Sequence, residues 1–228
     1  DVYKRQEDGP RAPPGIEIPM TRRVLPTPEQ LDGLRVRDPV LGEAMDRVPP
    51  FPGFPIPGLY DSHFHALARS IIYQQLAGKA AQTIHGRVLA LTPGPRFPRP
   101  EQLLELPEAG LRGAGLSRAK TRAVLDLANR TVSGELGLRA IRRHPDEQVV
   151  KTLTTVWGIG EWTAQMFLIF RLGRLDVMPS GDLGVQEGLR RLDGLEARPQ
   201  PSWVEERARV WAPLRSVAAW VLYRLCDE

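Results

Sequence analysis

Residues 153–164, with the sequence LTTVWGIGEWTA, decide the fold of this 228-residue chain. They predict a helix, a tight turn around Gly158, Ile159 and Gly160, and a second helix, because two glycines that flank one apolar residue let the backbone turn sharply. The first main-chain amides of the second helix have no partner within it, so they favour an anion such as a phosphate. The plain alternative is an ordinary helical turn that buries Ile159, and the rest of the sequence decides between the two.

Helical patterns extend on both sides of this hairpin. Thr27 and Asp38 each precede a proline, which is typical of a helix start. Asp61 is expected to cap a long helix whose apolar stripe runs to Gly78, and Ser117 is expected to cap another. Further helices are expected at about 79–91, 101–106, 108–113, 146–155, 182–192, 203–211 and 213–225. Because no β-strand alternation separates them, the predicted fold class is all-α.

The proline-rich segment 49–60, PPFPGFPIPGLY, predicts a stiff connector within one domain that covers residues 27–228. We expect a two-lobed helical fold with a cleft between the lobes, and the hairpin at 152–170. Residues 1–26 are polar and rich in proline and glycine, which predicts a disordered tail. This tail is alternatively artefactual, because its opening residues DVYKRQ resemble a translated sequencing adapter.

Composition narrows the partners and the chemistry. Of the 31 basic residues, 27 are arginine, the side chain best suited to bidentate phosphate contacts, although a GC-rich genome produces the same bias. Cys226 is the only cysteine, which excludes an intrachain disulfide and a cysteine-held zinc or iron–sulfur site. The longest apolar stretch, at 217–223, is too short to span a membrane, and the N-terminus shows no export signal. We therefore expect a cytoplasmic protein, located at the bacterial nucleoid, with no membrane partner.

The hairpin is followed by residues 177–185, VMPSGDLGV, and together the two segments resemble the helix-hairpin-helix (HhH-GPD) DNA glycosylases. Three further segments occur in the order typical of that superfamily: 71–81 (IIYQQLAGKAA), 115–120 (GLSRAK) and 211–216 (WAPLRS). The resemblance is closest to the DNA-3-methyladenine glycosylase II group and covers about residues 27–228. It implies a two-lobed glycosylase that acts on alkylated purines in double-stranded DNA as a monomer.

The resemblance implies that Asp182 is the catalytic residue, although an aspartate before a helix is also a favoured N-cap. A fixed carboxylate stabilises the oxocarbenium-like sugar that forms when the N-glycosidic bond breaks, and it orients the attacking water. Bifunctional members have a lysine nucleophile where this chain has Trp162. We therefore expect hydrolysis of 3-methyladenine and 7-methylguanine from DNA in base excision repair, without lyase activity.

By the same resemblance, a base pocket is formed by Trp162, Met166, Tyr223 and, at its edge, Phe64. The indole of Trp162 attracts a cationic alkylated purine by stacking and cation–π interaction. Taken singly, each apolar residue of this set is more often part of a core.

An everted base leaves a gap that a side chain must fill. The resemblance assigns this wedge to Gln75, or to Leu76 if the alignment slips by one residue, although leucine is the usual wedge. The phosphate grip is assigned to Gly158, Ile159, Gly160 and Thr163.

The sequence implies no cofactor and no metal held by side chains. His63 and His65 are two residues apart on a helix, so they point to different faces and cannot share an ion. The resemblance allows a monovalent cation held by main-chain carbonyls of the hairpin. Two alternatives stay open: a noncatalytic helix-hairpin-helix DNA-binding protein, and a glycosylase of the same fold for other damaged bases.

Overall fold

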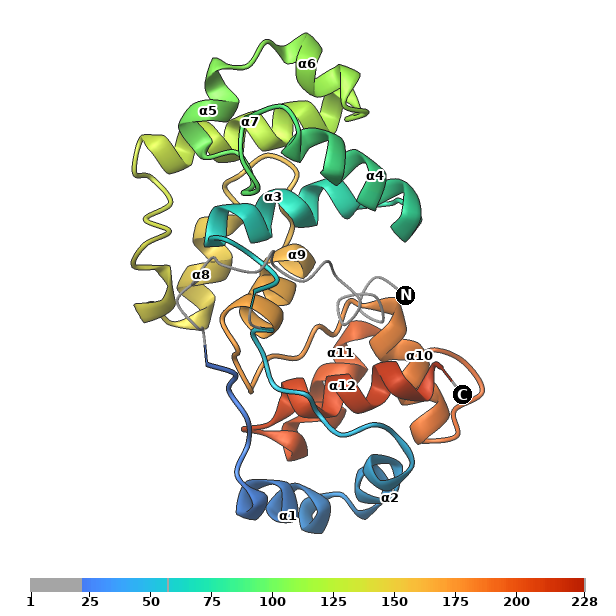
Figure 1. Cartoon of the computed structure of the whole chain (residues 1–228). Coiled ribbons are helices and arrows are strands. Elements are labelled where there is room, and N and C mark those ends of the chain that lie inside the picture. Colours follow the sequence, from blue (N-terminus) through green and yellow to red (C-terminus); the bar gives the residue numbers. More distant parts are fainter. Residues whose placement is uncertain (1–21, 57, 228) are drawn as a thin grey trace. The chain divides into compact units, whose positions relative to one another are not determined.

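The computed structural model describes residues 22–56 and 58–227, and every regular element in this part of the chain is a helix (Figure 1). The one β feature among these residues is an isolated bridge between Val24 and Phe54. The all-α prediction is therefore confirmed. No helix of the described chain has the length and apolar character needed to cross a bilayer.

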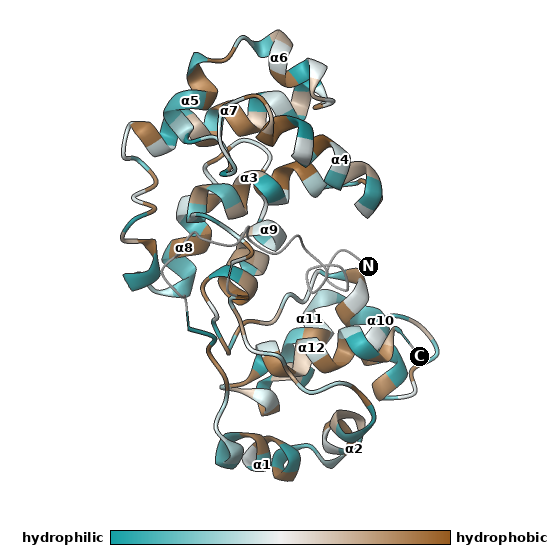
Figure 2. Cartoon of the chain, viewed as in Figure 1, coloured by the Kyte–Doolittle hydropathy of each residue, from teal (hydrophilic) through white to brown (hydrophobic). Residues whose placement is uncertain are grey.

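The chain divides into two units, with boundaries after residues 56 and 167. The first boundary lies inside the predicted proline-rich connector. The hairpin unit comprises the described residues from 58 to 167, and the aspartate unit comprises residues 22–56 and 168–227. Figure 2 shows hydrophobic and hydrophilic residues together on the helices of each unit, which is typical of helices that cover a core and face solvent.

In the aspartate unit, five α-helices and a 3₁₀ turn surround one core, and residues 168–171 belong to a π-helical turn. Trp211 lies fully buried in this core, and its indole Nε1 donates to Asp38 Oδ2 over 2.7 Å. Arg207 Nη1 lies 2.6 Å from the same carboxylate oxygen. The elements are α1 (Pro28–Arg37), α2 (Pro39–Arg47), α10 (Leu183–Leu192), α11 (Pro201–Arg207), η3 (Ala208–Trp211) and α12 (Arg215–Leu225).

The hairpin unit has a separate core, formed by fully buried side chains such as Leu67, Ile71, Leu103, Leu127 and Leu153. Within this unit α7 packs against α3 and α5. The elements are α3 (His63–Tyr73), α4 (Gly78–Leu89), α5 (Pro100–Glu105), α6 (Glu108–Gly113), α7 (Arg118–Val132), η1 (Ile141–Arg143), α8 (Asp146–Leu153) and α9 (Glu161–Met166).

Four capping predictions agree with the structure, and one is wrong. Helices α1, α2, α7 and α10 begin after the side-chain caps Thr27, Asp38, Ser117 and Asp182. Helix α3 begins after Ser62 rather than Asp61. The Asp61 carboxylate instead accepts the Phe97 N–H over 2.9 Å.

Two helices end earlier than their apolar patterns indicate. Helix α3 ends at Tyr73, well before Gly78, because Gln74 leaves the helical region with ψ of 133°. Gln75 then adopts a left-handed backbone with φ of 53°. Helix α9 passes after Met166 into a π-helical turn, η2, at Phe167–Arg171.

The N-terminal tail was expected to extend to residue 26. Within its described part, the Val24 N–H donates to Phe54 O over 2.8 Å. Residues 1–21 lie outside the described chain.

Candidate active site

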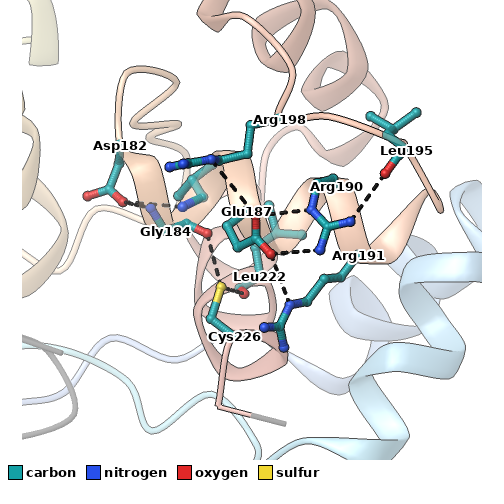
Figure 3. Close-up of polar contacts among 10 residues, drawn as sticks. Asp182, Gly184, Glu187, Arg190, Arg191, Leu195, Arg198, Leu222 and Cys226 are labelled. Carbon is teal, nitrogen blue, oxygen red and sulfur yellow. Dashed lines mark hydrogen bonds and ion pairs between the residues drawn. The ribbon is translucent and has the colours of Figure 1, made fainter.

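Asp182 lies at the start of α10, where its side chain serves as the N-cap. Its Oδ1 accepts the main-chain N–H groups of Gly184 and Val185 over 2.7 and 3.2 Å (Figure 3). The residue is 8% exposed. These two bonds fix the orientation of the carboxylate, and the helix N-terminus favours its negative charge.

The loop that leads to Asp182 is anchored by side chains of the same unit. The carboxylate of Asp176 pairs with Arg215, with 2.7 Å between Oδ1 and Nε, and the Val177 N–H donates to Ser216 Oγ over 3.0 Å. The buried Gln186 donates from Nε2 to the Ser180 carbonyl over 3.0 Å. The backbone before Asp182 is therefore held at both of its ends.

Helix α12 approaches the start of α10 closely. A Cβ on Gly184 would lie 3.0 Å from Asp182 Oδ1 and 3.1 Å from two ring atoms of Tyr223. The absence of a side chain at position 184 therefore lets Tyr223 lie beside the carboxylate. Of the predicted site, Asp182 and Tyr223 are the two residues that the aspartate unit brings together.

The thiol of Cys226 contacts the first turn of α10, and an arginine cluster lies further along the same helix (Figure 3). Cys226 Sγ lies 3.3 Å from the Gly184 carbonyl, and burial raises the pKa of this thiol, so it donates a weak hydrogen bond. Glu187 pairs with Arg190 and Arg191, which lower its pKa to about 2 mainly through the hydrogen bonds from Arg190.

In the hairpin unit, residues 154–160 form the predicted tight turn between α8 and α9. Gly158 has a φ of +81°, and a Cβ there would meet Ala123 at 3.1 Å. Ile159 is buried, whereas Gly158 and Gly160 are exposed. The turn therefore keeps its apolar residue in the core and leaves two glycine backbones at the surface.

Trp157 occupies the outer corner of this turn and is 50% exposed. The main-chain N–H of Trp157 donates to Asp126 Oδ2 over 2.7 Å, and the Arg122 guanidinium carbon lies 3.7 Å from the centre of the indole ring. The indole is thus held against α7 with one side in solvent. Nothing in the motif that predicted the hairpin indicates these partners.

The predicted pocket and phosphate residues of the hairpin unit have different exposures. Trp162 is 37% exposed on the first turn of α9, while Met166 is buried. Phe64 is buried beside Phe97, with 6.3 Å between ring centres. Thr163 is also buried, and its hydroxyl lies 3.4 Å from Gln74 Nε2, so its side chain does not present a phosphate contact.

The two candidate wedge residues differ in backbone and exposure. Gln75 is exposed and is the only non-glycine residue with positive φ among the described residues. Leu76 is partly buried. The structure therefore presents Gln75 more fully to solvent than Leu76.

The comparisons with known proteins point to one family. A family model described as HhH-GPD superfamily base excision DNA repair protein matches residues 68–213. DNA-3-methyladenine glycosylase 1 of Schizosaccharomyces pombe is 35% identical over 162 residues, which are 71% of this chain and 71% of the relative. DNA-3-methyladenine glycosylase 2 of Escherichia coli is 28% identical over 214 residues, which are 90% of this chain and 72% of the relative.

Solved structures agree with these relatives. The S. pombe 3-methyladenine DNA glycosylase in complex with abasic DNA has a TM-score of 0.74 and 29% identity, covering 88% of this chain and 97% of that one. A DNA-3-methyladenine glycosidase from Bacillus halodurans has a TM-score of 0.75 and 31% identity, covering 89% of this chain and 91% of that one. The family match spans the hairpin and the capped aspartate alike, and this chain belongs to the HhH-GPD superfamily of base excision DNA repair proteins.

Proposed function

We propose that this protein is a monofunctional DNA glycosylase that hydrolyses the N-glycosidic bond of alkylated purines, with 3-methyladenine and 7-methylguanine as substrates. The observation that carries the proposal is the carboxylate of Asp182, held at a helix start by two N–H groups in a chain of this superfamily. The relatives named as DNA-3-methyladenine glycosylases support the substrate class.

In the proposed reaction, the carboxylate of Asp182 acts on the sugar. As the bond to the base breaks, positive charge develops on the deoxyribose, and a fixed negative charge nearby stabilises it more than it stabilises the substrate. The same carboxylate orients the water that attacks the sugar carbon. Because Gly184 and Val185 already hold its Oδ1, little reorganisation is needed in the transition state.

The absence of lyase activity is part of the proposal. Lyase chemistry needs an amine that forms a Schiff base with the sugar, and Trp162 has none at the corresponding position. Its partly exposed indole suits a cationic base instead, since such a base gains from both stacking and cation–π attraction. Met166, one turn further along α9, is proposed to line the same pocket.

Phosphate contacts are proposed for the hairpin turn. Main-chain N–H groups at Gly158, Gly160 and Thr163 would bind the DNA backbone without reading sequence. Ile159 would contribute only through its place in the turn, because its N–H already donates to the Val156 carbonyl over 3.1 Å. We also propose a monovalent cation at this turn, where residues 154–160 supply main-chain carbonyl oxygens. Those carbonyls would hold the ion, which would add positive charge beside a phosphate. We propose that the protein binds DNA as a monomer.

The proposal is tested with a panel of duplexes that each contain one lesion. Wild-type protein is expected to release 3-methyladenine and 7-methylguanine and to leave abasic strands that break only after treatment with alkali. Asp182→Asn keeps the oxygen that accepts the two N–H bonds but removes the charge. Its single-turnover rate is expected to fall by at least about 10²-fold, with binding to abasic-site duplex preserved.

Two results would contradict the proposal. If wild-type protein bound the duplexes but released no base from any of them, the chain would be a noncatalytic DNA-binding member of its superfamily. If Asp182→Asn released bases at the wild-type rate, the catalytic role of Asp182 would be wrong.

A further inference from the structure

The short segment between α3 and α4 has a strained backbone. Gln75 takes a left-handed conformation, with φ of 53°, that glycine adopts readily and that costs free energy for a residue with a Cβ. Such conformations persist only where surrounding contacts impose them, and they are concentrated at functional sites. The contacts that impose this one come from two other elements of the hairpin unit.

The first contact is an ammonium group at the C-terminal end of α3. Lys120 Nζ, from the first turn of α7, donates to the carbonyls of Ile72 and Gln74 over 2.7 and 2.6 Å. Carbonyls at a helix C-terminus have no partner within the helix, and a cation there is favoured. Burial lowers the pKa of Lys120, in keeping with an amine held away from water. Its bond to the Gln74 carbonyl fixes the peptide that precedes Gln75.

The second contact links the same segment to the hairpin turn. Gln74 Nε2 donates to the Gly158 carbonyl over 2.9 Å and lies 3.4 Å from Thr163 Oγ1. Gly158 itself has positive φ, and Thr163 is buried. The side chain of Gln74 therefore connects the strained turn directly to the proposed phosphate grip, entirely within one unit of the chain.

We infer that Lys120 and Gln74 are positioning residues that hold the Gln75 wedge in its left-handed conformation and tie it to the hairpin, so that insertion of the wedge is coupled to phosphate binding. This inference rests on the proposed glycosylase function. When the hairpin binds a phosphate, the wedge is presented at a fixed place along the duplex. A wedge ordered before DNA arrives does not lose conformational freedom on insertion, which lowers the cost of everting the base.

Coupling of this kind predicts a defect that depends on the substrate. Everting a paired base costs unpairing and unstacking energy, and a base that has no partner costs less to evert. Loss of the positioning contacts should therefore slow excision of a paired lesion and spare excision of an unpaired one. Misfolding, in contrast, would slow both by the same factor.

The experiment compares 7-methylguanine opposite cytosine with 7-methylguanine opposite a tetrahydrofuran abasic analogue, under single-turnover conditions. Lys120→Met keeps the aliphatic stem and removes the donors, and Gln74→Met removes the link to Gly158 without altering charge. Each variant is expected to lower the rate on the paired lesion by about tenfold, with less than about threefold change on the unpaired lesion. Lys120→Arg, which retains donors, should recover part of the loss.

Lys151→Met is the matched control, because it removes the charge of an exposed lysine from the same unit. It should leave the ratio of the two rates unchanged. Fluorescence of 2-aminopurine beside the lesion reports eversion independently of bond cleavage, and its increase on binding should fall for Lys120→Met and Gln74→Met.

The outcomes separate this inference from the proposed function. If wild-type protein releases no base from either duplex, the glycosylase proposal is wrong. If wild-type protein is active and the Lys120 and Gln74 variants lose activity equally on both duplexes, or lose none, the positioning inference is wrong. If Lys120→Met fails to fold, Gln74→Met and the 2-aminopurine signal decide the question.

Discussion

Two glycines on α10 offer a test of how the structure separates stability from catalysis. A Cβ on Gly188 would lie 2.6 Å from Leu222 C and 2.8 Å from Leu222 Cα, and closer still to its carbonyl oxygen. All three atoms belong to the backbone of α12, which cannot rotate away. A Cβ on Gly184 would instead meet side-chain atoms of Asp182 and Tyr223 at 3.0 to 3.1 Å.

For Gly188→Ala, α12 must move away from α10, and overpacking of this kind costs about 1–3 kcal/mol. We take the upper end of that range because the clash is with backbone. Alanine recovers about 1 kcal/mol of helix propensity, so the net loss is about 2 kcal/mol. For a chain of this length, that loss lowers the melting temperature by about 4–8 °C.

For Gly184→Ala, the neighbours yield by a few tenths of an ångström, so the helix-propensity gain offsets most of the strain. The groups that yield are the carboxylate of Asp182 and the ring of Tyr223. Because a misplacement of about 1 Å can cost about 10²-fold in rate, we expect a loss of about tenfold in single-turnover base release. The melting temperature should change by less than about 2 °C.

Thermal unfolding followed by circular dichroism and single-turnover excision of 7-methylguanine measure the two effects. Gly181→Ala is the matched control, because no atom lies within 4 Å of a Cβ built there, and both measurements should stay at wild-type values. The reasoning is refuted if Gly188→Ala melts at the wild-type temperature. It is equally refuted if Gly184→Ala releases base as fast as the control.

Three further outcomes follow from other parts of the chain. Gln75→Gly should be more stable to urea than Gln75→Ala by about 1 kcal/mol, because glycine accepts the left-handed backbone, while both should lose excision of paired lesions; equal stabilities would argue against strain at this position. Burial, aided by the charges of neighbouring groups, lowers the pKa of His85 to about 3. Between about pH 6.5 and pH 3, the unfolded chain therefore binds a proton at His85 that the folded chain does not bind. The free energy of unfolding should fall as pH drops through this range, by up to about 1.4 kcal/mol per pH unit. His85→Phe should flatten that slope. Burial alone would raise the pKa of Asp38, but hydrogen bonds from Arg207 and the other donors lower it. The carboxylate of Asp38 therefore stabilises the fold above pH 3.8, and this stabilisation is lost as pH falls through the lower pKa of the folded state. Acid titrations of unfolding should show no such loss for Asp38→Asn.

Helix starts could be predicted from the sequence because caps are local. Thr27, Asp38, Ser117 and Asp182 each bond to N–H groups two or three residues ahead, and that requirement is visible in the sequence alone. Asp61 is also an aspartate just before a predicted helix, yet its carboxylate accepts the N–H of Phe97, 36 positions away. A long-range partner of this kind leaves no local pattern, so Ser62 was missed as the cap.

Helix ends were harder to predict because tertiary contacts determine them. The apolar stripe of α3 continues past Tyr73, but the helix breaks before Gly78, where Lys120 donates to the carbonyls of Ile72 and Gln74 and Gln74 donates to the Gly158 carbonyl. Main-chain acceptors are present at every residue, so no sequence pattern distinguishes the ones that a lysine selects. Segment 115–120 resembles the superfamily in sequence, but its contact with the end of α3 follows only from the fold.

The candidate site was predictable in part for the same reason. The order of the hairpin and the aspartate along the chain identified Asp182 and the Gly158 turn. The roles of Gln186 and Gln74 were missed, because these side chains donate to main-chain carbonyls, which every residue has. Gly184 and Gly188 did leave a signal, because two glycines four residues apart lie on one helix face and permit a close neighbour. That spacing could have indicated the close approach of α12 to the catalytic candidate.

The two interpretations of Asp182, as helix cap and as catalytic group, were alternatives in the sequence and are compatible in the structure. A cap requires an oxygen that accepts hydrogen bonds, and asparagine supplies one as well as aspartate does. Stabilising a cationic sugar requires the charge in addition, and asparagine lacks it. The hydrogen bonds that order the helix also orient the carboxylate and favour its charge. A helix start therefore orients the carboxylate of Asp182 and favours its charge. The anchored loop before Asp182 and the space that Gly184 leaves for Tyr223 complete the immediate surroundings of the carboxylate.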